Sequence, residues 1–152
     1  MRRPGAFSAT RLSVLLATAV FVAVPALAQD AGVRAGVSVD PDQFYFGGHL
    51  ETAPLVDRLY FRPNAEVGFG NDRTVLAVNM EFVYKFPRRR AWGLYAGGGP
   101  ALNVNMRDER TNTDAGLNFL VGAEQSSGLF FEFKVGAIDS PNLKFGVGYT
   151  FR

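Results

Sequence analysis

His49 is the only histidine of the 152-residue chain and the first candidate for general acid–base chemistry. Glu51 follows two positions later, and in a β-strand this spacing places both side chains on one face. A hydrolytic site would also need a nucleophile, and the pattern places no serine hydroxyl beside this pair. We therefore expect no catalytic residues, and we interpret His49 as an interior side chain hydrogen-bonded to Glu51 or to a tyrosine.

Cofactor and metal chemistry find no support in the residue types. The sequence contains no cysteine, which excludes thiolate chemistry and disulfides. The glycine-x-glycine strings lie inside strand-like segments with no helix after them, so none of them is a nucleotide or phosphate loop. No cluster of metal-ligating residue types occurs either. We expect no cofactor and no metal.

The segments that must position these residues are β-strands. From Ala31 onward apolar and polar residues alternate, and turn-forming residues interrupt the alternation at regular intervals. No helical periodicity of useful length occurs. Seven turns leave eight expected strands, a meander of hairpins, at residues 32–39, 43–52, 58–69, 73–86, 92–104, 113–124, 128–137 and 142–152.

Each expected strand has one apolar and one charged face, because successive strand side chains point to opposite sides. The apolar face carries no charged residue and holds most of the phenylalanines. The other face is rich in glycine and includes Lys144 and a larger titratable set. That set is Arg34, His49, Glu51, Arg58, Arg62, Glu66, Glu81, Lys85, Glu124, Glu132, Lys134 and Arg152.

The aromatic residues decide which face of a closed barrel is inside. A soluble barrel buries its apolar face, and a membrane barrel turns it outward. So much aromatic bulk does not fit inside eight strands, whereas glycines relieve crowding around interior charges. Aromatic residues also gather at strand ends, as at two membrane interfaces. Phe44, Phe46 and Phe69 fall at one level, and Phe61, Tyr84, Phe86, Trp92, Phe131, Tyr149 and Phe151 at the other.

The pattern predicts an all-β fold, an eight-stranded antiparallel up-and-down transmembrane β-barrel. A soluble periplasmic barrel that binds an apolar ligand is the alternative. Charges inside a membrane barrel must be paired or hydrated, so we expect the titratable set to form an interior ion-pair network. The hypothesis is a plug in the half nearer the chain ends, below a shallow cup lined by Ser38, Tyr45, Ala77, Ala101 and Asn103. A uniformly filled interior is the alternative and the one we favour, and neither arrangement is an open pore.

Residues 1–28 have the pattern of a cleaved export signal. Three arginines precede or flank an apolar run of thirteen residues, too short to span a bilayer, and Ala26-Leu27-Ala28 supplies a cleavage site. Residues 29–152 then form one barrel domain. Without the signal the chain has 13 basic and 14 acidic residues, so charge gives no argument for binding nucleic acid.

The C-terminal strand carries a spaced motif: Lys144, Gly146, Tyr149 and Phe151. With the eight-strand pattern, this motif resembles the small outer-membrane barrels of Gram-negative bacteria, the OmpA-transmembrane-domain and OmpX kind. In that family the last strand is an assembly signal, commonly with the aromatic residue last, whereas here Arg152 follows it. The family's large adhesive loops are absent, and only residues 107–114 make an outer loop of useful length.

The resemblance implies an outer-membrane location and a non-catalytic structural or surface-interaction role. Expected partners are outer-membrane lipid, lipopolysaccharide, the barrel-assembly machinery and periplasmic chaperones. A monomer is favoured, although the oligomeric state stays open. Some barrels of this kind modify lipid A and need a histidine, so a lipid-modifying enzyme is a further alternative.

Three prolines interrupt the strand pattern or follow it. Pro63 and Pro100 lie inside expected strands and cannot donate to a ladder. We interpret both as β-bulges that adjust curvature, with a lateral gate for lipid as the alternative. Pro87 opens the turn sequence Pro-Arg-Arg-Arg, which either contacts acidic lipid headgroups or is a solvated turn.

Overall fold

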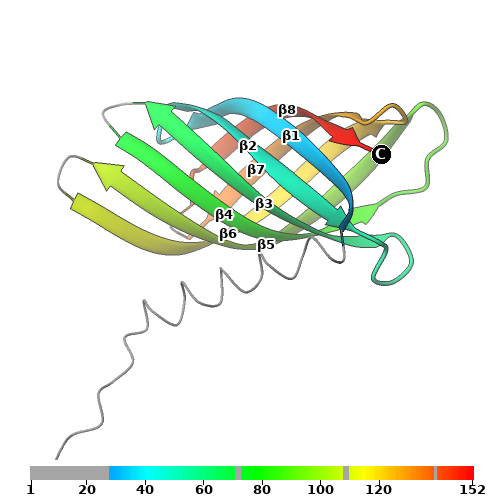
Figure 1. Cartoon of the computed structure of the whole chain (residues 1–152), viewed down its shortest axis with the longest axis horizontal. Coiled ribbons are helices and arrows are strands. Elements are labelled where there is room, and N and C mark those ends of the chain that lie inside the picture. Colours follow the sequence, from blue (N-terminus) through cyan, green and yellow to red (C-terminus); the bar gives the residue numbers. More distant parts are fainter. Residues whose placement is uncertain (1–27, 71–72, 108–109, 139) are drawn as a thin grey trace, which may run out of the picture.

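The computed structural model describes residues 28–70, 73–107, 110–138 and 140–152. The predicted signal lies outside these residues except for Ala28, with which the first strand begins. No helix in the described part of the chain is long and apolar enough to cross a bilayer. Eight strands form the fold (Figure 1): β1 Ala28–Val39, β2 Gln43–Thr52, β3 Leu59–Gly70, β4 Arg73–Lys85, β5 Trp92–Arg107, β6 Arg110–Gln125, β7 Leu129–Ala137 and β8 Leu143–Phe151.

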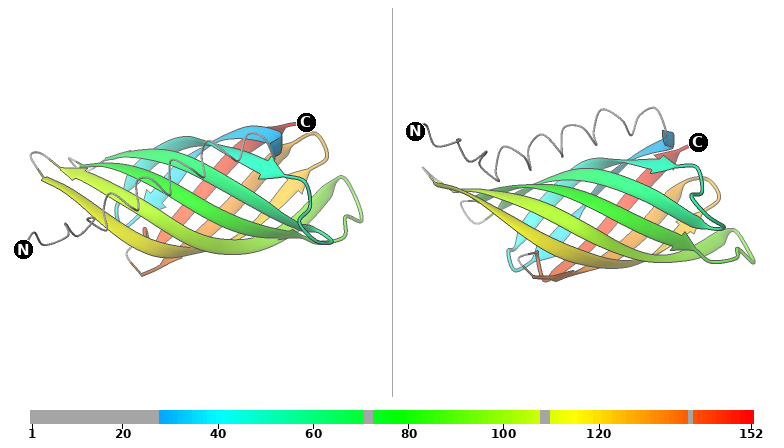
Figure 2. Two further views of the ribbon diagram at one scale, coloured as in Figure 1. Left: turned by 60° about the horizontal axis from the view of Figure 1, so that its bottom comes forward. Right: turned by 90° about the horizontal axis from the view of Figure 1, so that it is seen from below.

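The eight strands close into one antiparallel barrel in sequence order. The closing pair joins β1 to β8, from Ala31 opposite Phe151 to Val39 opposite Leu143. Figure 2 shows the strands inclined to the long axis of the barrel. Because β1 starts and β8 stops at the same end, we name this the terminal end and the opposite one the distal end. The predicted fold of eight antiparallel strands is confirmed.

The two faces of the barrel wall differ sharply in burial. Outward side chains such as Phe44, Leu94, Phe119 and Phe145 are each more than half exposed. Inward positions hold the buried polar and charged side chains, among them Glu81, which is fully buried. This is the inverse of a water-soluble barrel, because the apolar side chains face the surroundings and the ions face one another.

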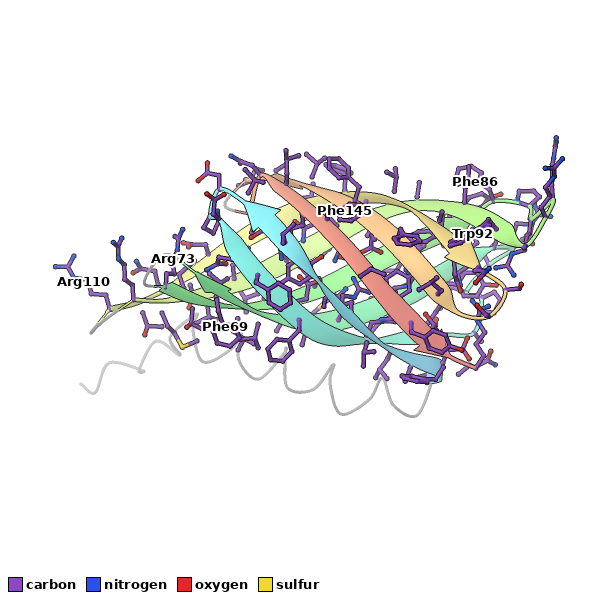
Figure 3. All side chains as sticks on the ribbon, turned by 90° about the horizontal axis from the view of Figure 1, so that it is seen from above. Phe69, Arg73, Phe86, Trp92, Arg110 and Phe145 are labelled. Carbon is purple, nitrogen blue, oxygen red and sulfur yellow. The ribbon has the colours of Figure 1, made fainter. Side chains whose placement is uncertain are left out.

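Outward aromatic side chains meet in pairs at both ends. At the terminal end the ring centroids of Trp92 and Phe131 lie 5.7 Å apart, although strand β6 separates them. Small Ala123 stands between the two on β6, opposite Phe131 and Leu94 in the ladders, and leaves room for the contact. Figure 3 shows Trp92 and Phe86 at the end opposite Arg73 and Arg110.

The remaining members of the expected terminal-end aromatic belt also lie outward. The rings of Tyr84 and Phe86 are 5.3 Å apart, as are those of Tyr149 and Phe151. Phe61 contacts Phe82 at 5.2 Å. At the distal level Phe46 stacks on Phe69 at 5.8 Å, and Phe44 pairs with Phe69 in the ladder. That these belts mark membrane interfaces stays a prediction.

The hairpin of β5 and β6 differs from the sequence expectation. Residues 107–114 were expected as an outer loop, but β5 continues to Arg107 and β6 begins at Arg110. These two arginines pair in the ladder, and so do Asn105 and Asn112. Polar residues can extend a hairpin beyond the apolar wall because no buried face is needed there. The long-loop prediction is therefore wrong.

The interpretation of Pro63 and Pro100 as bulges is also wrong. Pro63 lies opposite Met80 in an unshifted ladder, at the point where pairing of β3 with β2 ends at Asn64. At Pro100 the ladder to β4 omits Met80 and Glu81, but it resumes in the same register at Phe82. No residue is inserted at either site, so the prolines remove ladder bonds without shifting the strands.

Candidate functional site

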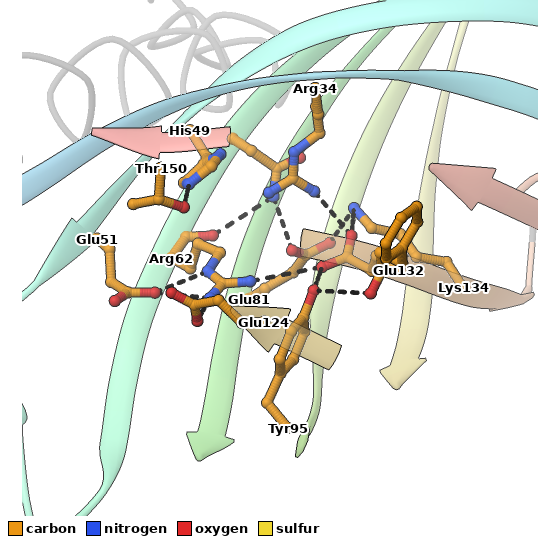
Figure 4. Close-up of polar contacts among 12 residues, drawn as sticks. Arg34, His49, Glu51, Arg62, Glu81, Tyr95, Glu124, Glu132, Lys134 and Thr150 are labelled. Carbon is orange, nitrogen blue, oxygen red and sulfur yellow. Dashed lines mark hydrogen bonds and ion pairs between the residues drawn. The ribbon is translucent and has the colours of Figure 1, made fainter. Parts of the chain in front are cut away.

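Glu132 on β7 is the centre of the polar interior (Figure 4). Its carboxylate accepts a hydrogen bond of 2.9 Å from Nη1 of Arg34 on β1 and one of 3.0 Å from the hydroxyl of Tyr95 on β5. Nη1 of Arg62 on β3 lies 3.5 Å away, and Nζ of Lys134 lies 3.4 Å away. One carboxylate therefore ties four strands together across the lumen.

Lys134 forms a second centre toward the distal end. Its Nζ donates to Oε1 of Glu81 on β4 at 2.6 Å and to Oε1 of Glu66 on β3 at 3.0 Å. Glu66 also accepts a hydrogen bond of 2.7 Å from Lys144 on β8. These contacts span the barrel from β7 and β8 to β3 and β4, so the side chains fill the lumen at this level.

A third group of ions lies at the terminal end. Nη2 of Arg62 is 2.7 Å from Oε2 of Glu51, and Lys85 also pairs with Glu51. Nζ of Lys85 is 3.2 Å from Glu124, which pairs in addition with Arg152. The side chain of Arg152 thus extends the ion pairs at the terminal end beyond the last residue of β8.

The interior charges balance within the described chain. Five buried carboxylates, Glu51, Glu66, Glu81, Glu124 and Glu132, meet five amines or guanidinium groups, Arg34, Arg62, Lys85, Lys134 and Lys144. Arg152 adds a sixth cation, and Nε of this residue is also 3.6 Å from Asp30. Mutual pairing offsets the desolvation that each ion would otherwise suffer.

Arg58 does not belong to this network, and its assignment to the interior is wrong. It precedes β3 in the turn between β2 and β3, with a φ of 61°. Its side chain is 44% exposed, and its ion pair within the described part of the chain is with Asp57, at 3.9 Å. The alternation rule fails here because the residue lies in a turn, where side chains no longer alternate across a sheet.

A row of asparagines connects to the ions and was not predicted as a unit. Nδ2 of Asn118 donates to Asn79 at 2.8 Å, Asn79 donates to Asn64 at 2.7 Å, and Asn64 donates to Glu81 at 2.8 Å. All three asparagines are buried. The sequence places them on the inward face, but only the register between β3 and β4 aligns Asn64 with Asn79.

An apolar cluster also lies inside the wall, made of Val83, Tyr95, Leu120 and Phe130. Phe130 is 1% exposed, and its ring lies 5.5 Å below the guanidinium of Arg34. Arg62 lies 4.8 Å from the ring of Tyr95. Aromatic faces attract cations, so these rings serve as further partners for the two arginines. Strict alternation along β7 is the signal that puts Phe130 inside.

His49 has different partners from those expected. Its Nε2 is 3.2 Å from the hydroxyl of Thr150 on β8, and its ring meets Phe130 edge to face at 5.4 Å. Neither Glu51 nor a tyrosine is bonded to it, because Arg62 and Lys85 engage Glu51. Among the described residues the Nδ1 atom has no hydrogen-bond partner. The interior location was expected, whereas the partner prediction is wrong.

Glycines make room for the interior side chains, and Gly122 gives a test of this. A Cβ at Gly122 would meet the Tyr95 ring at 2.2 Å, whereas one at outward Gly48 would have its nearest contact at 3.4 Å. We expect Gly122→Ala to cost about 1–3 kcal/mol by displacing Tyr95 from Glu132. Gly48→Ala is expected to be neutral or slightly stabilising. Urea unfolding of the two refolded variants measures the difference, and equal midpoints would contradict the crowded interior.

A polar cup opens at the distal end. It has a volume of about 220 Å³ and is lined by Asp40, Pro41, Arg73, Val75, Asn103, Asn105, Asp114, Ser140 and Pro141. Below it Ser38, Tyr45 and Ala77 line a gap of only about 10 Å³, next to the Lys144–Glu66 pair. The interior therefore resembles a cup above a layer of ion pairs more closely than a uniformly filled lumen. Of the expected cup residues only Asn103 lines the open part.

The residues of the C-terminal motif occupy both faces of β8. Lys144 points inward to Glu66, and Gly146 leaves space for the Tyr45 hydroxyl, which a Cβ would approach at 2.4 Å. Tyr149 and Phe151 point outward. Each residue of the motif thus has a place in the finished barrel. Its recognition by an assembly machinery stays a prediction.

Comparison with known proteins agrees with this architecture. No protein-family model matches the chain, and no curated protein matches it in sequence. Among solved structures, Neisserial surface protein A (NspA) is similar with a TM-score of 0.64 and 14% identity, over 80% of this chain and 93% of the other. The N-terminal β-barrel domain of Pseudomonas aeruginosa OprF gives a TM-score of 0.58 and 13% identity, over 82% and 99%. At these identities the likeness shows the fold.

Proposed function

We propose that the chain is an integral outer-membrane β-barrel with a structural or surface-interaction role. The observation that carries this proposal is the inverted wall: bulky apolar side chains are exposed around the barrel, and five carboxylates are buried inside it. Exposed apolar surface of this extent is unstable in water but matches the hydrocarbon region of a bilayer. The fold shared with NspA and OprF, one of them a surface protein by name, supports the same location.

The interior supports a closed barrel without catalysis. Side chains from β1, β3, β5 and β7 meet at Glu132 and bridge the lumen, so we infer no open pore. His49 lies inside against Thr150 and Phe130, away from the lipid-facing surface on which a lipid-modifying site would act. Export by the N-terminal signal, monomeric assembly, and contact with lipopolysaccharide, the assembly machinery and periplasmic chaperones belong to this proposal.

Fractionation of a Gram-negative host that expresses the full chain tests the proposal. We expect the protein in the outer-membrane fraction, and a change of gel mobility on boiling, because a closed ladder resists detergent until heated. A soluble protein known to be exported to the periplasm marks the control fraction. Recovery of the chain in the soluble periplasmic fraction would overturn the membrane assignment and favour a soluble barrel with an apolar ligand.

A further inference from the structure

The connections between strands carry opposite charge at the two ends of the barrel. At the distal end the described connecting residues, 40–42, 138 and 140–142, include two aspartates, Asp40 and Asp42, and no basic residue. At the terminal end the connections 53–58, 86–91 and 126–128 contain four arginines and one aspartate. This asymmetry is not needed for the closed ladder, so it points to different surroundings at the two ends.

The four arginines lie on two turns, and the first turn is hydrogen-bonded to the residue that directly precedes the second. The backbone N–H of Lys85, at the end of β4, donates to the carbonyl of Arg58 at 2.9 Å. Arg88, Arg89 and Arg90 follow in the next connection, which Phe86 and Trp92 bracket. We call these two turns, residues 53–58 and 86–91, the basic rim.

The three guanidinium groups on the second turn of the basic rim have no counter-ion among the residues that the structure describes. Arg88, Arg89 and Arg90 are exposed, and none of them forms an ion pair with any residue that the structure describes. Asp57 lies beside Arg58 at 3.9 Å. Three adjacent positive charges repel one another unless an external anion lies between them.

Apolar side chains place the basic rim at the depth of lipid headgroups. Leu55 and Val56 on the first turn are 53% and 69% exposed, although water should disfavour both. Phe86 and Trp92 at the base of the second turn are 48% and 40% exposed on the outer wall. Aromatic side chains at a barrel end lie at the membrane interface, and the arginines extend just beyond them.

We propose that the basic rim binds the phosphate headgroups of anionic phospholipids in the leaflet around the terminal end. An arginine fork matches phosphate oxygens with two parallel hydrogen bonds, and a cluster of arginines next to a membrane selects anionic lipid. The acidic connections of the distal end disfavour the same lipids there. This proposal rests on the proposed membrane location and adds a lipid class and a site to it.

Trp92 makes the test direct, because it is the only tryptophan of the chain and lies two residues from Arg90. The full barrel domain is refolded into vesicles of phosphatidylcholine that contain either brominated phosphatidylglycerol or brominated phosphatidylcholine. Quenching of Trp92 fluorescence reports the lipids around it. From the quenching we expect phosphatidylglycerol to be enriched around Trp92 over phosphatidylcholine by at least about fivefold. This is the enrichment that one arginine bound at a membrane surface would give.

The variant Arg88→Gln/Arg89→Gln/Arg90→Gln is expected to abolish the preference while Trp92 is still quenched by both lipids. Its matched control, Arg73→Gln/Arg107→Gln/Arg110→Gln, removes the same charge at the distal end and should keep the preference. Equal quenching by both lipids in the unmodified protein would overturn the headgroup site but leave the membrane location intact. Absence of quenching by either lipid would instead reject the membrane location itself.

Discussion

Replacing Glu132 by glutamine is expected to lower the free energy of unfolding by about 3–5 kcal/mol, the usual cost of removing one member of a buried ion group. The reason is the number of cations that depend on this carboxylate. Arg34, Arg62 and Lys134 all lie within 3.5 Å of it, and each would remain buried with less opposite charge. Glutamine keeps the shape of the side chain, so the loss measures charge rather than packing.

Urea unfolding of barrels refolded into vesicles, followed by gel mobility and fluorescence, measures this loss. Asp57→Asn is the control, because it also removes one carboxylate, but from an 85% exposed side chain with a single arginine at 3.9 Å. We expect less than about 1 kcal/mol for the control, as for other surface pairs. A Glu132→Gln barrel as stable as the unmodified one would show that the interior ions are hydrated individually and do not depend on one another.

The alternation of residue types was enough to predict the architecture. Side chains of a strand point strictly to two sides, so a charge-free face on every strand implies a wall with one apolar surface. The count of turns then gives eight strands, and closure requires the last strand to pair with the first. Val147 opposite Ala35 and Phe145 opposite Val37 show that pairing, with apolar residues outward on both strands.

The partners inside the barrel could not be predicted in the same way. Which residues meet across the lumen depends on the stagger and tilt of all eight strands, and the sequence pattern does not fix these quantities. Glu51 therefore pairs with Arg62 and Lys85, and His49 is hydrogen-bonded to Thr150 instead of to Glu51. Arg58 was misplaced for a local reason, since a turn residue with positive φ follows no strand alternation.

The two surfaces of the wall make different demands on the sequence. Inside, each charged residue needs particular partners. Lys134, for example, contacts three carboxylates, those of Glu66, Glu81 and Glu132. Outside, lipid provides a uniform apolar environment, so residue type matters more than residue identity. Interior positions should therefore tolerate fewer substitutions than outward ones. The exception is a charged residue at an outward position, which we expect to be poorly tolerated.

Phe145→Lys tests that exception and is expected to destabilise the barrel by about 2–4 kcal/mol in a bilayer, the cost of a lysine near the midplane. Phe145 is 53% exposed, and Figure 3 shows it on β8 about midway between the two ends. Lysine at such a site would be well tolerated in water but must leave the hydrocarbon region in a membrane. The expected loss thus depends on the lipid and not on the contacts within the protein.

Two further variants separate the charge from its side effects. Phe145→Leu removes the ring without adding a charge and should cost much less than the lysine variant. Met106→Lys adds the same charge near the distal end, at a side chain that is 40% exposed, and should cost about 0–1 kcal/mol because interfaces tolerate lysine. Unfolding in vesicles orders the three variants. If Phe145→Lys and Met106→Lys were equally mild, the outer wall would not lie in hydrocarbon, and its exposed phenylalanines would need a different environment.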